Sequence, residues 1–281
     1  MIFPMIRIEM STSSVYPLST ESAFQIAAAA GFDGIEIMIT NDPTTQDAAG
    51  LLELSRRFEL PILSVHAPVL LLTQFVWGLD YRTKLERSAE LAAAVGAGTV
   101  VVHPPFRWQF AYAREFEALV RELSERYDLE LAVENMFGWK LGPVTIRGYS
   151  PSPDPVLSDC DALTLDFSHA SLGGRDSLEF ALAMGDRLRH VHLCDGPGSM
   201  AEGFLFDEHR VPGHGTQPVA EVVEYLAGRK WNGSLVAEVN TRSAKDEAGR
   251  LDMLVETVEF ARRHIEAGRR SRARGSRTAS A

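Results

Sequence analysis

The chain has 281 residues, of which 45% are hydrophobic and 23% charged, with 22 glycines, 14 prolines and two cysteines. This composition is typical of a folded globular protein, and two cysteines are too few for a disulfide framework or a structural zinc cluster. No run of about 18 apolar residues is present, and no signal-peptide pattern opens the sequence, so we expect a cytoplasmic protein that does not span a membrane.

The charge is unevenly distributed. The formal net charge is −10, but residues 268–281 hold five arginines and no acidic residue, which leaves 23 basic and 38 acidic side chains, a net charge of −15, on residues 1–267. Binding a nucleic-acid backbone requires a basic face, which this acidic body is not expected to offer. Residues 268–281 lack apolar periodicity, and we expect a disordered basic tail, with weak anion or RNA binding as the functional alternative.

Short β-branched runs alternate with longer segments of helical periodicity. The runs predicted as strands are residues 6–10, 34–39, 62–66, 99–103, 130–134, 163–166, 188–193 and 234–239. The segments predicted as helices are residues 20–30, 45–58, 81–95, 112–127, 154–159, 177–184, 218–227 and 244–266. Continuous apolar runs indicate parallel strands covered on both faces. Eight such units predict an α/β fold, a (β/α)8 TIM barrel, as a single domain over residues 1–267. An open doubly wound sheet is the alternative, but no glycine-rich phosphate-binding motif follows the first strand.

Histidine and carboxylate side chains occupy the carboxyl ends of six consecutive predicted strands and the loops that follow them. Imidazole and carboxylate together suit Zn, Mn, Fe or Co, whereas an all-oxygen set would suit Mg or Ca. Taken singly, each of these side chains is as well explained as a hydrogen-bond partner of loop amides. Their joint occurrence predicts one to three divalent transition-metal ions, zinc or manganese. The set is His66, His103, Glu134, Asp166, His169, His192, Asp207, His209 and Glu238. His190 lies outside it, and we expect it to point to the face of its strand opposite His192.

At these residues the sequence resembles the xylose-isomerase-like TIM-barrel superfamily, which contains sugar isomerases and epimerases and also endonuclease IV. The resemblance covers about residues 5–265. In the epimerase branch one divalent metal is held at the ends of strands five to eight, by ligands matched here by Glu134, Asp166, His192 and Glu238. In endonuclease IV the site extends to three zinc ions, and the additional ligands are matched by His66, His103, His169, Asp207 and His209.

The resemblance implies a metal-dependent isomerase or epimerase, or a dehydratase, that acts on a sugar, sugar phosphate or keto-polyol through a metal-stabilised enediolate. Glu134 and Glu238 would remove and return the proton, while His169 would steady a substrate hydroxyl or bind a second metal. The alternative is a multi-zinc phosphodiester hydrolase similar to endonuclease IV, which the full ligand set favours and the acidic body opposes. A second alternative is a non-catalytic barrel that binds a sugar through a structural metal.

Aromatic and basic residues in the loops predict a substrate pocket over the metal. Phe106, Trp108 and Trp139 would form a small, water-excluding pocket suited to the face of a sugar or cyclic polyol, although packing between the loops explains them as well. Arg242 lies near enough to the rim to hold a phosphate or carboxylate. The expected partner is therefore a small sugar or polyol, and we expect no nucleic acid.

Overall fold

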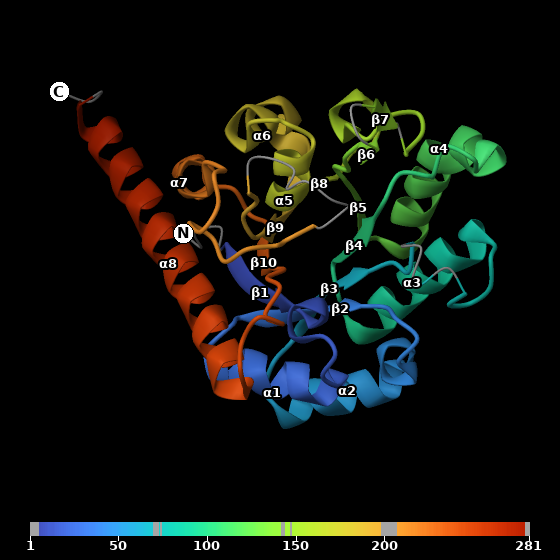
Figure 1. Ribbon diagram of the computed structural model, residues 1–281, viewed down its shortest axis with the longest axis horizontal. Coiled ribbons are helices and arrows are strands. Elements are labelled where there is room, and N and C mark those ends of the chain that lie inside the picture. The colour runs from blue at the N-terminus through green and yellow to red at the C-terminus, as the bar shows by residue number, and fades with distance from the viewer. Residues whose placement is uncertain are drawn as a thin grey trace.

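Eight parallel strands form a closed barrel that is surrounded by helices in the computed structural model of the chain (Figure 1). The structure describes residues 6–69, 73, 75–141, 144–146, 148–197 and 207–278. Neighbouring barrel strands follow one another in the sequence, and the last pairs with the first to close the ring. The expected (β/α)8 TIM barrel is therefore confirmed. The barrel strands are β1 (Arg7–Ser11), β2 (Gly34–Met38), β3 (Ile62–His66), β4 (Thr99–Val102), β5 (Glu130–Glu134), β8 (Leu163–Asp166), β9 (Leu188–Leu193) and β10 (Ser234–Ala237).

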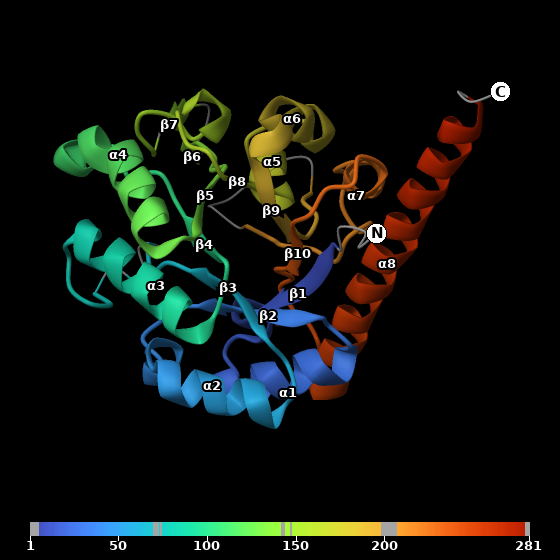
Figure 2. The ribbon, with the colours of Figure 1, turned by 180° about the vertical axis from the view of Figure 1, so that it is seen from behind.

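The helices cover the outside of the barrel, as both views show (Figures 1 and 2). Capping residues define the ends of α1 and α3. The side chains of Ser19 and Asp80 accept hydrogen bonds from the backbone amides of the first turns. Gly31 and Gly96 end the two helices in the left-handed conformation, with φ of 82° and 78°. Within the described residues no helix is both long and apolar enough to cross a membrane. The helices are α1 (Thr20–Ala30), α2 (Ala48–Arg57), α3 (Tyr81–Val95), α4 (Phe110–Tyr127), α5 (Phe167–Leu172), α6 (Ser177–Met184), α7 (Val219–Gly228) and α8 (Glu247–Thr278).

The regular alternation of strand and helix is interrupted between β5 and β8. A small antiparallel pair, β6 (Trp139–Leu141) and β7 (Val144–Ile146), lies there, and only a single 3-10 turn at Pro155–Leu157 takes the place of the helix predicted over residues 154–159. The prediction of that helix was wrong because prolines crowd this segment, and proline lacks the amide hydrogen that an α-helix needs.

Helix α8 continues beyond its predicted end at residue 266. In the structure it runs to Thr278, so residues 268–278 of the expected tail are drawn as a continuation of the helix, while residues 279–281 lie outside the described part of the chain. Five of residues 268–278 are arginine, a good helix former, and no proline occurs there, so the helix continues from the part of α8 that packs against α7. Figure 1 shows its end extending past the body, and residues 269–274 are exposed.

Gly268 lies where α8 packs closely against α7. A Cβ atom at this position would lie 2.2 Å from the backbone oxygen of Glu224. We expect a chain shortened to residue 268 to keep its melting temperature, whereas Gly268→Ala should lower the free energy of unfolding by about 1–3 kcal/mol through overpacking. Thermal unfolding of both variants checks this, and a loss of many degrees in the shortened chain would show that residues 269–281 stabilise the fold.

Polar side chains occupy part of the barrel interior. Four polar residues are fully buried and lie on β1, β2, β3 and β9: Glu9, Glu36, Ser64 and His190. Their neighbours in the strands, such as Ile35, belong to the hydrophobic core. Alternation along these four strands therefore places polar groups inside the barrel and apolar groups against the helices.

Candidate metal centre

The nine predicted ligands lie together at the carboxyl ends of the barrel strands. His66, Glu134 and Asp166 are the last residues of β3, β5 and β8. His103 and Glu238 directly follow β4 and β10. The remaining four come from β9, α5 and the loop after β9. Parallel strands of a barrel end at one rim, so side chains that are distant in the sequence meet there.

The ligand-type atoms of these residues fall into three groups, in each of which they lie within 4.8 Å of one another. Such convergence of imidazole and carboxylate atoms is what a divalent transition metal requires. We name them the flanking group (His66, His103 and Glu134), the central group (Glu134, Asp166, His192 and Glu238) and the loop group (His169, Asp207 and His209).

Glu134 belongs to both the flanking and the central group. Its Oε1 lies 3.0 Å from His192 Nδ1 and 3.1 Å from His169 Nδ1, and its Oε2 lies 2.8 Å from His103 Nε2 and 3.4 Å from His66 Nε2. Burial favours the neutral acid, but the surrounding histidines, above all His192, hold the pKa of Glu134 well below its usual value. A carboxylate in this position would be available to a metal ion in either group.

His192 is the nitrogen donor of the central group. Its Nδ1 lies 2.9 Å from Glu238 Oε2 and 3.6 Å from Asp166 Oδ2, in addition to its contact with Glu134. Burial opposes protonation of this ring, yet the nearby carboxylates raise the pKa of His192 well above its usual value. The pKa of Glu238 falls to about 2, because the positive ring outweighs the effect of burial. Three carboxylates around one ring nitrogen form a ligand set for a divalent cation.

The loop group adjoins the central group. Asp207 Oδ2 lies 2.8 Å from His169 Nε2 and 2.9 Å from His209 Nε2, and His209 Nε2 also lies 3.5 Å from Asp166 Oδ2 of the central group. Despite burial, these carboxylates raise the pKa of His209 to about 9. His209 itself has a φ of 38°, a left-handed conformation that costs a non-glycine residue free energy and is often found at functional sites.

Unsatisfied atoms show that these residues fit a metal ion. Glu134 Oε2, His103 Nε2 and His209 Nε2 are buried and make no hydrogen bond of normal geometry with any other described residue. Burying such atoms without a partner costs free energy, which a bound cation would recover. Together with the mixture of imidazole and carboxylate donors, this fits a divalent metal ion.

A cleft of about 740 Å³ opens beside the central and loop groups. Glu238, Asp207 and His209 line it, so these three candidate ligands are accessible from the cleft. Its size suits a small molecule, and its polar walls suit a molecule that carries several hydroxyl groups. The other polar wall residues include Thr12, Ser13, Thr40, Asn41, Asp42 and Asn240.

The predicted substrate residues lie in different places. Arg242 lines the cleft, with its guanidinium 5.8 Å from the centre of the Tyr16 ring. Phe106 and Trp108 stack on each other, with ring centroids 4.7 Å apart, and are not among the residues that line the cleft. Trp139 begins β6, but its side chain lies outside the described part of the structure.

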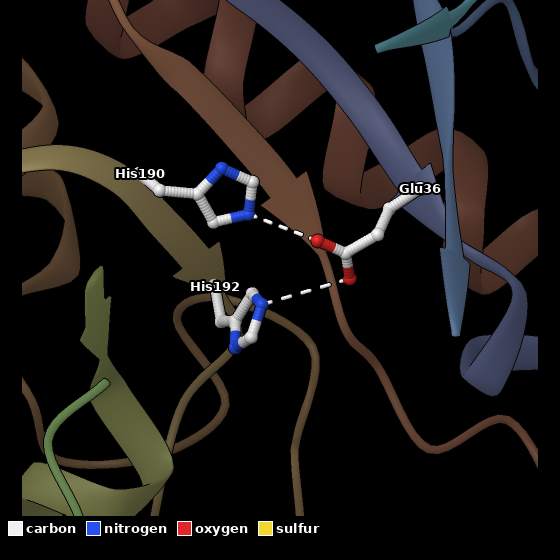
Figure 3. Close-up of side chains that lie close together, drawn as sticks. All are labelled: Glu36, His190 and His192. Atoms are coloured by element: carbon white, nitrogen blue, oxygen red, sulfur yellow. Dashed lines mark hydrogen bonds and ion pairs between the residues drawn. The ribbon is translucent and has the colours of Figure 1, made fainter. Parts of the chain in front are cut away.

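Glu36 was not among the predicted site residues, and His190 lies on a different face of its strand from the one expected. Figure 3 shows His190 and His192 pointing to the same carboxylate, with His190 Nε2 3.0 Å from Glu36 Oε2 and His192 Nε2 3.6 Å from Glu36 Oε1. The expectation for His190 was wrong because residues two apart in a strand share a face. Burial favours a neutral Glu36, but His192 and His190 hold its pKa well below the usual value. A glutamate within the otherwise apolar run of β2 was the signal that could have revealed it.

The fold and site define a class of protein: a TIM barrel with clustered imidazole and carboxylate groups at the carboxyl ends of its strands. The chain belongs to the xylose isomerase-like TIM barrel family, whose model matches residues 24–264.

Individual relatives agree with this assignment. An uncharacterised protein of Mycobacterium leprae is 45% identical over 282 residues, which cover 93% of this chain and 99% of that protein. Fructoselysine 3-epimerase of Escherichia coli O157:H7 is 22% identical over 259 residues, which cover 83% of this chain and 90% of the enzyme. The crystal structure of a D-tagatose 3-epimerase-like protein has a TM-score of 0.69 at 23% identity, over 95% of this chain and 99% of that one. This structural similarity supports the barrel fold.

Proposed function

We propose that the protein is a divalent-metal-dependent isomerase or epimerase that acts on a sugar, a sugar phosphate or a keto-polyol. The observation that carries the proposal is the position of Glu238, which belongs to the central group and also lines the polar cleft. A substrate in that cleft would therefore meet both a metal and a carboxylate. The likeness to fructoselysine 3-epimerase and to a D-tagatose 3-epimerase-like protein supports the same class of reaction.

The central group would hold the catalytic metal. When bound, the ion supplies a positive charge that polarises the carbonyl group and a neighbouring hydroxyl of the substrate. Glu238 is the residue best placed to take up the proton next to that carbonyl, because its carboxylate belongs to the central group and lines the cleft. Ser13 Oγ donates to Glu238 Oε1 at 3.0 Å and so helps to orient the carboxylate.

Glu134 and His169 take supporting roles in this proposal. Glu134 was expected to transfer a proton together with Glu238, but it is 1% exposed and is not among the residues that line the cleft. We therefore assign it the role of shared ligand. His169 contacts both Glu134 and Asp207, which suits a ligand of an additional metal better than a partner of a substrate hydroxyl.

Metal content is the first test of this function. Because three groups of ligand-type atoms converge, we expect two or three zinc or manganese ions per chain in protein purified without chelator. Elemental analysis measures this, with His214→Gln as a control, since His214 is exposed and pairs with Glu256 outside the three groups. Less than half an equivalent of any transition metal, with no uptake on titration, would contradict the proposed function.

A multi-metal phosphodiester hydrolase is the second candidate. The loop group favours it, because together with the other two groups it completes an array able to hold three ions beside one cleft. Clustered ions can generate hydroxide and neutralise a phosphodiester. The net charge of −15 on residues 1–267 opposes it, since a nucleic-acid backbone would be repelled.

Incubation with duplex DNA that contains an abasic site separates these two functions. We expect no incision by the metal-loaded protein even at low salt, where electrostatic binding of nucleic acid is strongest. Product formation resolved on a denaturing gel is the measurement. Efficient incision with less enzyme than DNA would establish the hydrolase instead.

A further inference from the structure

A connected set of buried polar side chains lies inside the barrel next to the central group. Glu9, Glu36, Ser64 and His190, which we call the interior cluster, are all fully buried. TIM-barrel interiors are filled mainly by branched apolar residues, and burying carboxylates there carries a large desolvation cost. Hydrophobic residues of similar volume would often be as stable or more so, which favours a functional role for the cluster.

Glu36 is the member that reaches toward the candidate metal centre. Its Oε2 lies 3.0 Å from His190 Nε2 and accepts a hydrogen bond from Ser64 Oγ at 3.2 Å. Its Oε1 lies 3.6 Å from His192 Nε2, and neither of these two atoms makes a hydrogen bond with another described residue (Figure 3). One oxygen of Glu36 is thus fixed, while the other is presented to His192.

The two nitrogens of His192 have different surroundings. Nδ1 faces Glu134 and Glu238 of the central group at 3.0 and 2.9 Å, whereas Nε2 faces Glu36. A ring nitrogen that binds a metal cannot carry a proton, so the neutral ring must carry its proton on Nε2. Glu36 Oε1 lies 3.6 Å from that nitrogen, which is longer than a normal hydrogen bond, and it would accept the proton once the two atoms approach by a few tenths of an ångström.

We propose that Glu36 is a positioning residue for the central metal. It accepts the Nε2 proton of His192 and thereby directs Nδ1 of the same ring into the central group, while His190 and Ser64 keep its carboxylate in place. This inference rests on the proposed metal site. Carboxylates that support a ligand histidine in this way fix the orientation of the ring and make it a stronger donor, and their loss commonly weakens metal binding 10- to 100-fold.

Competition titration with a chromophoric zinc chelator tests the role of Glu36, with Glu9 as a matched control. Glu9 is also a buried carboxylate and shares the Ser64 hydroxyl at 2.7 Å, but its described contacts do not include His192. In Glu36→Gln, the zinc equivalent held by the central group should bind about 10- to 100-fold more weakly than in the unaltered protein. Glu9→Gln should change the affinity for each zinc equivalent by no more than about twofold.

Each outcome has a separate meaning. Equal affinity in Glu36→Gln and the unaltered protein, or an equal loss in Glu9→Gln, would overturn the positioning role. Failure of the unaltered protein to bind zinc would instead overturn the proposed function.

The visible spectrum of the cobalt-substituted protein provides a second readout. Because Glu36 acts on the ligand field through His192, the d–d bands should change in Glu36→Gln and stay unchanged in Glu9→Gln. Glu36→Asp keeps the charge and should recover part of the affinity, and it serves as the test variant if the glutamine variant does not fold. An unchanged spectrum in both folded Glu36 variants would overturn the proposal.

Discussion

Replacement of Glu238 by glutamine is expected to lower turnover by at least about 10³-fold, because the variant keeps the shape of the side chain but loses both a metal ligand and the proton acceptor. No other carboxylate of the central group lines the cleft. The reaction is followed by incorporation of solvent deuterium into a panel of ketoses, since an isomerase or epimerase exchanges a carbon-bound proton during turnover. Metal content is measured on the same samples.

Asp207→Asn is the matched comparison for this experiment. Asp207 also lines the cleft, but it belongs to the loop group and not to the central group. We expect this variant to lose at most one metal equivalent and to reduce turnover only modestly. Equal, near-complete loss of turnover in both variants would contradict a single catalytic metal and favour a reaction that needs the whole array.

Replacement of Glu134 by glutamine should weaken metal binding in two groups at once, because the flanking and central groups share this carboxylate. The amide keeps the volume but removes the negative charge that faces four histidines, so we expect the loss of at least one metal equivalent and of nearly all turnover. Elemental analysis and the deuterium assay measure the two effects.

Glu130→Gln is the control for Glu134, since both residues lie in β5. Glu130 is exposed at the opposite end of that strand and pairs with Arg189 at 3.2 Å, an interaction of little energetic weight at the surface. This variant should keep its metal and its activity. Full metal content in Glu134→Gln would refute the idea that one carboxylate serves two groups.

The barrel and the convergence of the nine residues could be predicted because both depend on simple periodic features. Apolar runs mark the strands, and parallel strands bring their carboxyl ends to one rim, so His66 and Glu238 meet despite their separation in the sequence. Family membership then confirmed the fold. The metal ligation itself stays a prediction.

Features that depend on three-dimensional closure could not be predicted in the same way. Glu36 and Glu9 lie within apolar runs, and only the closed barrel shows that they face inward rather than toward the helices. The stacking of Phe106 and Trp108 away from the cleft depends on loop conformation, for which the sequence has no periodic signal. The length of α8 depends on helix propagation from a packed stem, which composition alone did not reveal.

If the proposed metal centre is correct, the shared position of Glu134 implies that the flanking and central groups would not fill independently. Binding of one ion would neutralise part of the charge of Glu134, which weakens binding of a second ion. It would also remove protons from the nearby histidines, which strengthens binding of the second ion. Whichever effect dominates, thermodynamic reciprocity requires each ion to change the affinity of the other by the same factor. Metal loading would then follow a cooperative or anticooperative isotherm, so that the free metal concentration in the surroundings decides how many ions the centre carries.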